Sequence, residues 1–152
     1  GMMGVTIFAS LLCVMSIVWI IVQSYFISTE SGEGCIIWHE DLYPIQYTIF
    51  YGRLIFKSLF YLLIALFLFK QLKAIKNGVL FPRANVKILY GMALSYFIGN
   101  TCDENVSTAL FFENSGSLVL NSDTWLYVAL LIVFALIYKV AVSVSEENNL
   151  TI

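Results

Sequence analysis

Four long hydrophobic stretches, separated by short polar segments, make up most of the chain. The first, residues 4–28, contains no charged residue, and the others cover residues 45–70, 86–108 and 124–144. About 20 apolar residues in a helix cross roughly 30 Å of hydrocarbon, so each stretch is long enough to span a membrane. The pattern predicts an all-α fold: a single membrane domain, residues 2–152, forming an integral membrane four-helix bundle with consecutive helices antiparallel, up and down.

The first stretch has a second interpretation, a secretory signal peptide. Such a peptide starts with basic residues, has a shorter apolar part and ends at a small-residue cleavage site. Residues 2–6 contain no Lys or Arg. A membrane-spanning helix therefore accounts better for this part of the chain.

Composition points to lipid as the solvent for most of the chain. Hydrophobic residues make up 60% of the 152 residues and charged residues 12%, which is more apolar than a soluble domain of this size. The formal net charge is -2. Because binding to nucleic acid needs a dense positive surface, we expect the lipid bilayer as the main partner and no direct contact with nucleic acid.

Basic residues are concentrated between the second and third stretches. That connection carries no acidic residue, whereas the connections on either side, residues 29–44 and 113–123, are acidic. Lys and Arg in short loops stay on the cytoplasmic side during insertion. We therefore expect the basic connection and both termini in the cytoplasm, and the two acidic connections outside. The basic residues are Lys70, Lys73, Lys76, Arg83 and Lys87.

Four charged residues lie away from the basic connection, in the outer halves of the second and third predicted spans. Arg53 and Lys57 are four residues apart and share one face of the second helix, and Asp103 and Glu104 lie near the outer end of the third. At 1.5 Å per residue, Arg53 and Asp103 both lie roughly 25 Å from the basic connection. An unpaired charge at mid-membrane costs on the order of 2.5 to 3.5 kcal/mol. We therefore predict that the four residues form a cluster facing the bundle interior or an outer vestibule.

The predicted cluster has two interpretations. Ionisable groups inside a membrane are candidate ion, proton or ligand sites. Alternatively, the same charges form a structural clasp between two helices, or lie on helix ends that project into water. The sequence leaves both interpretations open.

Two of the three cysteines are expected on the same side of the membrane. Cys35 lies in the first outer connection and Cys102 at the outer end of the third span, so they can form a disulfide or remain two free thiols. Cys13 lies within the first span and is expected to be an ordinary buried side chain. The chain has no C-x-x-C pair, so a thiol oxidoreductase is not expected.

Sequence signatures of catalysis are missing. The chain contains no Gly-rich phosphate loop, nucleophile elbow or H-E-x-x-H motif. His39 is followed by Glu40 and Asp41, but adjacent side chains in an extended loop point apart, which argues against a metal site. We therefore predict a non-enzymatic protein without a metal or another cofactor.

The basic connection carries a recognisable pattern. Residues 75–89 read IKNGVLFPRANVKIL, and the chain ends in SEENNLTI. Together these segments resemble a family of small bacterial four-helix membrane proteins of unknown function, the YoaS-like proteins. The resemblance implies a cytoplasmic turn marked in this chain by Lys76, Gly78, Phe81 and Asn85. It also implies a location in the bacterial cytoplasmic (inner) membrane.

The family resemblance suggests one function, and the helical layout allows another. Genes of the family often neighbour small helix-turn-helix regulators, which implies a regulatory or sensory partner of such a DNA-binding protein at the cytoplasmic face. The basic turn and the acidic tail, residues 145–152, could dock it, or the turn could serve only topology and contact with anionic lipid. The alternative is a subunit of a small transporter or channel that works as a homo-oligomer, because four helices alone rarely enclose a path.

Overall fold

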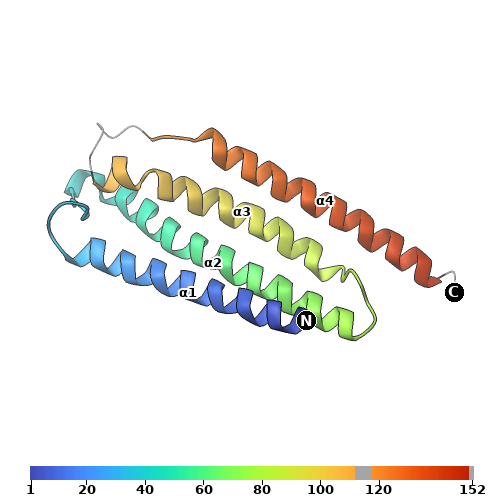
Figure 1. Ribbon diagram of the computed structural model, residues 1–152. Helices are drawn as coiled ribbons and strands as arrows, with labels where there is room; N and C mark the ends of the chain where they lie inside the picture. Colours follow the sequence, from blue (N-terminus) through green and yellow to red (C-terminus); the bar gives the residue numbers. More distant parts are fainter. Residues whose placement is uncertain (112–117, 151–152) are drawn as a thin grey trace.

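The structure, a computed structural model, describes residues 1–111 and 118–150 apart from the side chains of residues 107 and 108, and is helical with no strand in that part of the chain (Figure 1). The all-α prediction is confirmed. A short 3-10 turn precedes the second helix and a π-helical turn follows the third. The elements are α1 (Met2–Thr29), η1 (Glu40–Leu42), α2 (Tyr43–Lys76), α3 (Ala84–Glu104), η2 (Val106–Leu110) and α4 (Ser122–Leu150).

The helices lie side by side in a row and not in a closed bundle. Consecutive helices run in opposite directions, so both termini and the α2–α3 connection lie at one end, here called the termini end (Figure 1). Packing joins α1 to α2, α2 to α3, and α3 to α4, and within the described residues α1 and α4 do not touch. The predicted four-helix bundle is thus corrected to an open row. In a membrane, apolar side chains would gain nothing by closing the row, because lipid is as apolar as they are.

Small residues let neighbouring helices approach closely. On α3, Gly91, Ser95 and Gly99 recur every four residues on the face toward α2. A Cβ on Gly99 would lie 2.8 Å from the backbone nitrogen of Lys57, and one on Gly91 would lie 3.3 Å from Leu63. Such small-residue spacing is typical of helix contacts in membranes. On α1, the buried face is likewise mostly small: Thr6, Ser10, Cys13, Ile20 and Ser24.

Three of the four helices are long and apolar enough to cross a membrane: α1, α4, and α2 with the turn before it. The shorter α3 is not among those found in the described residues. It carries Asn85, Lys87, Asn100 and Asp103 within 21 residues. Because α3 has a helix on each side, polar side chains can face protein. The composition of the helices thus supports three of the four predicted spans.

Helix boundaries differ most from the predicted spans at three C-terminal ends. α2 continues six residues beyond position 70, and Gly78 follows its end with a φ of +79°. α3 ends at Glu104, four residues early, because the Asn105 side chain binds the carbonyl of Thr101 and begins a new turn. α4 extends beyond position 144 to Leu150, so most of the tail is helical. Positions 113–117 of the predicted outer connection and 151–152 of the tail lie outside the described residues.

The close contact at Gly99 predicts the effect of a single methyl group. Gly99→Ala should lower the free energy of unfolding by about 1–3 kcal/mol, because the methyl group overlaps the α2 backbone. Denaturant titration in detergent, followed by helical circular dichroism, measures the change. The matched control is Gly4→Ala on α1, where a Cβ meets nothing within 4 Å and the substitution should be neutral or stabilising. Equal effects of the two substitutions would contradict the close contact.

A charged cleft as the candidate functional site

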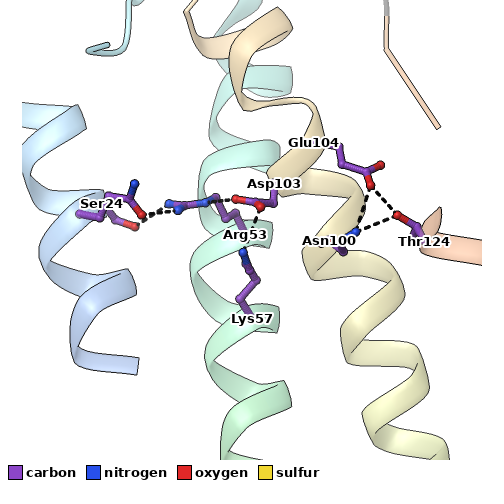
Figure 2. A network of polar contacts seen from close by, with 8 residues as sticks. Ser24, Arg53, Lys57, Asn100, Asp103, Glu104 and Thr124 are labelled. Carbon is purple, nitrogen blue, oxygen red and sulfur yellow. Dashed lines mark hydrogen bonds and ion pairs between the residues drawn. The ribbon is translucent and has the colours of Figure 1, made fainter. Parts of the chain in front are cut away.

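Arg53 lies at the centre of a polar network that joins three helices (Figure 2). Its Nε donates to Asp103 Oδ1 on α3 at 2.6 Å. On the opposite side, Nη2 donates to Gln23 Oε1 at 2.7 Å and Nη1 to Ser24 Oγ at 3.3 Å, both on α1. Lys57 Nζ donates to the second oxygen of Asp103 at 3.0 Å. We call Arg53, Lys57 and Asp103 the charge cluster.

The spacing of residues along α2 and α3 explains why the charge cluster forms. Arg53 and Lys57 share one face of α2 because they are four residues apart. Asp103 follows Gly99 by the same interval, so it continues the small-residue face of α3 that packs on α2. Arg53 is 6% exposed. A buried guanidinium needs acceptors, which Asp103, Gln23 and Ser24 provide.

Glu104 does not join the cluster. Its carboxylate accepts a hydrogen bond from Asn100 Nδ2 on α3 at 3.0 Å and one from Thr124 Oγ1 at 2.7 Å, and the second ties α3 to α4 (Figure 2). Successive residues of a helix point about 100° apart, so Glu104 faces one neighbouring helix while Asp103 faces the other. The predicted four-residue cluster is therefore corrected to three residues.

The charge cluster borders a cleft of about 600 Å³ between α1 and α2. The cleft belongs to the side of the row and not to the interior of a bundle. Gln23 and the charge cluster form its polar end, and the remaining wall is largely apolar. The side chains that form this wall on α1 include Leu12, Met15, Trp19 and Ile20, and Tyr61 contributes from α2.

Of the two alternatives for Cys35 and Cys102, a disulfide or two free thiols, the structure shows free cysteines. Cys102 instead packs against α2 at Gly52, and a Cβ on that glycine would lie 2.6 Å from the sulfur. Cys13 is buried, as expected from its place in the first span. Cys13 and Cys102 thus contribute to packing, and Cys102 directly precedes Asp103 of the charge cluster in sequence.

Residues of the predicted cytoplasmic turn belong to a second polar network at the termini end. Asn85 is fully buried, and its Nδ2 donates to Gln71 Oε1 at 3.2 Å and to the Tyr138 hydroxyl at 3.3 Å. The Tyr138 hydroxyl donates to Gln71 at 2.6 Å, and Phe81 packs edge-on against the Tyr138 ring. Lys76 is exposed. This network joins α2, α3 and α4 at the end opposite the charge cluster.

The basic turn and the acidic tail meet in one exposed ion pair. Arg83 donates two hydrogen bonds to the carboxylate of Glu146 near the end of α4. The hydrogen bond and the positive charge of Arg83 lower the pKa of Glu146 from its ordinary value. An exposed pair of this kind adds little stability, so it indicates that the two segments lie side by side and does little to hold them there.

Uncharged polar residues in the helices were missed by reasoning from charge alone. Gln23 and Ser24 complete the contacts of Arg53. Gln46 is 1% exposed, and its amide donates to the carbonyls of Ile37 and Ala109 at the end of the helices opposite the termini end. In the sequence, an amide side chain within an apolar stretch could have identified such residues, because a buried amide group has to form hydrogen bonds.

A double-mutant cycle tests the coupling between Arg53 and Asp103. Arg53→Gln and Asp103→Asn should each destabilise the chain, because each leaves an incompletely paired polar group. The double variant should show a coupling energy of about 0.5–3 kcal/mol in the free energy of unfolding. The matched control pairs Arg53→Gln with Glu104→Gln, which should be additive because Glu104 binds α4. Additivity in both cycles would contradict the ion pair.

Comparisons with known proteins add no assignment to this geometry. The chain matches no protein-family model, no curated protein and no solved structure. The resemblance to the YoaS-like family thus stays a prediction from residues 75–89 and the C-terminal segment. A function has to be argued from the cleft and the helices around it.

Proposed function

We propose that the chain is a non-enzymatic, multi-pass membrane protein, with both termini in the cytoplasm, that acts as a sensor. A ligand bound in the cleft would be reported to a small DNA-binding regulator at the termini end. The three apolar helices support the membrane location. So does the aromatic group at the far end, where Trp38 packs against Tyr43 and Tyr47, since such residues anchor proteins at membrane interfaces.

The observation that carries the proposal is that the charge cluster faces a cleft. A purely structural clasp needs only paired charges sealed between helices. Here all three charged side chains line a volume of about 600 Å³, within the range of small-molecule sites in proteins. The Lys57 side chain is 25% exposed and the Asp103 side chain 34%, so both remain accessible from the cleft. The arrangement favours binding over a clasp alone.

Helix α2 offers a physical route from the cleft to the proposed cytoplasmic face. It runs without a break from Arg53 to Lys76, 23 residues or roughly 35 Å. Arg53 contacts α1 and α3 at one end, and Gln71 contacts α3 and α4 at the other. A ligand that favours one position of α2 would therefore bias contacts at the termini end.

Gene expression in the source organism tests the sensory role. Three chromosomal variants are compared with wild type: deletion of the gene, a chain ending at Val144, and Lys57→Gln. If the chain signals to a regulator, the deletion and the truncation should shift the same small set of transcripts several-fold, and Lys57→Gln should change their level. Lys139→Gln on α4, outside the cleft, is the matched control, and membrane abundance is checked for every variant.

A different outcome would favour the alternative, an oligomeric transporter or channel. The open row leaves the outer faces of α1 and α4 uncovered by other described helices, so further copies could pack there. Unchanged transcripts, together with ion conductance or uptake in liposomes that Arg53→Gln abolishes, would overturn the sensory proposal.

A further inference from the structure

The cleft carries an excess of positive charge. Arg53 and Lys57 contribute two positive charges and Asp103 one negative charge, so the charge cluster sums to +1. Among the described residues, no other charged side chain lines the cleft. The polar end is thus complementary to one anionic group, and a cation would meet net repulsion.

Hydrogen-bond donors remain for such an anion. A guanidinium has five N–H groups, and the contacts of Arg53 with Asp103, Ser24 and Gln23 use three of them. An ammonium has three, of which Lys57 uses one for Asp103. Arg53 is more than nine-tenths buried and still lines the cleft. Carboxylates and phosphates are the groups that such paired donors bind best.

The rest of the cleft suits a hydrocarbon chain. Leu12, Met15 and Trp19 lie on one face of α1 at helical spacing, and Tyr61 faces them from α2. Between Gln23 and Leu12 the wall extends 11 residues, or roughly 16 Å. Leu12, Met15 and Trp19 are 49%, 68% and 66% exposed, so this end opens at the outside of the row, where lipid would lie. A ligand could therefore enter from the bilayer with its chain along α1.

We infer that the cleft binds an anionic amphiphile, with its carboxylate or phosphate headgroup at Arg53 and Lys57 and its acyl chain along Leu12, Met15 and Trp19. The inference rests on the membrane location in the proposed function and names the class of ligand for the same site. A small soluble anion would fill only the polar end. A neutral lipid would offer no charged acceptor to the remaining donors of Arg53 and Lys57.

Fluorescence of Trp19 provides a direct test in the full-length chain. The other two tryptophans are replaced (Trp38→Phe, Trp125→Phe), and the protein is placed in nanodiscs of zwitterionic lipid. A fatty acid brominated along its chain is then titrated, because bromine quenches tryptophan on contact. Saturable quenching should appear at a concentration at least about tenfold lower than for the methyl ester of the same acid, which lacks the charge.

Lys57→Gln is the decisive variant because it leaves the Arg53–Asp103 pair in place. It should weaken quenching by the acid roughly tenfold and leave the ester unchanged. Lys139→Gln, another lysine removed from a helix outside the cleft, should have no effect on either. Circular dichroism of each variant verifies that it remains folded. Equal quenching by acid and ester, or no response to Lys57→Gln, would overturn the inference.

Two further arms identify the source of the headgroup. Nanodiscs with a brominated anionic phospholipid test a carrier that is part of the bilayer, and inorganic phosphate as a competitor tests the headgroup alone. Saturable quenching by the phospholipid that Lys57→Gln weakens would make bilayer lipid a source, whereas quenching by the fatty acid alone would make a free acid the ligand. The assay contains no regulator, so a failed sensory role and a failed ligand assignment give separate results.

Discussion

The buried guanidinium of Arg53 is the constraint around which the far half of the molecule is arranged. A cation that is 6% exposed in an apolar chain has to be surrounded by acceptors, and here those acceptors come from two other helices. The hydrogen bonds of Arg53 therefore fix the position of α1 and α3 along α2 and their rotation about their own axes. The glycine and serine residues on α3 make this possible, because bulkier residues would hold Asp103 away from its partners.

Polar contacts specify how the helices are arranged relative to one another, because the burial of apolar side chains contributes little to that specificity. Large apolar side chains on α1 and α4 are mostly exposed, which is expected of helices in the membrane location proposed above. Helix association then depends on close packing and on hydrogen bonds between helices. The charge cluster joins α1, α2 and α3, Glu104 joins α3 to α4, and the network of Asn85, Gln71 and Tyr138 joins three helices at the termini end. Such contacts therefore join neighbouring helices both at the termini end and at the opposite end of the helices.

Much of the fold could be predicted from the hydrophobic pattern, and less of the site. The four stretches predicted four helices because apolar runs of 20 residues are hard to interpret otherwise, and the height argument brought Arg53 and Asp103 to the same level. The position of a residue along a helix does not say in which direction its side chain points around the helix axis. The sequence therefore predicts Glu104 in the cluster, although the side chain of Glu104 points about 100° away from that of Asp103 and contacts Thr124. The open row was not predictable for a related reason, since an apolar surface is equally stable against lipid and against another helix.

Solid-state NMR on the unmodified chain in lipid bilayers tests the central claim most directly. With ¹⁵N in arginine and ¹³C in the aspartate carboxyls, the dephasing between Arg53 Nε and the Asp103 carboxyl carbon reports their separation. A nitrogen to oxygen distance of 2.6 Å predicts strong dephasing for this pair. A carboxyl signal of Asp103 that is untouched by arginine nitrogen, in a folded and bilayer-embedded chain, would contradict the account.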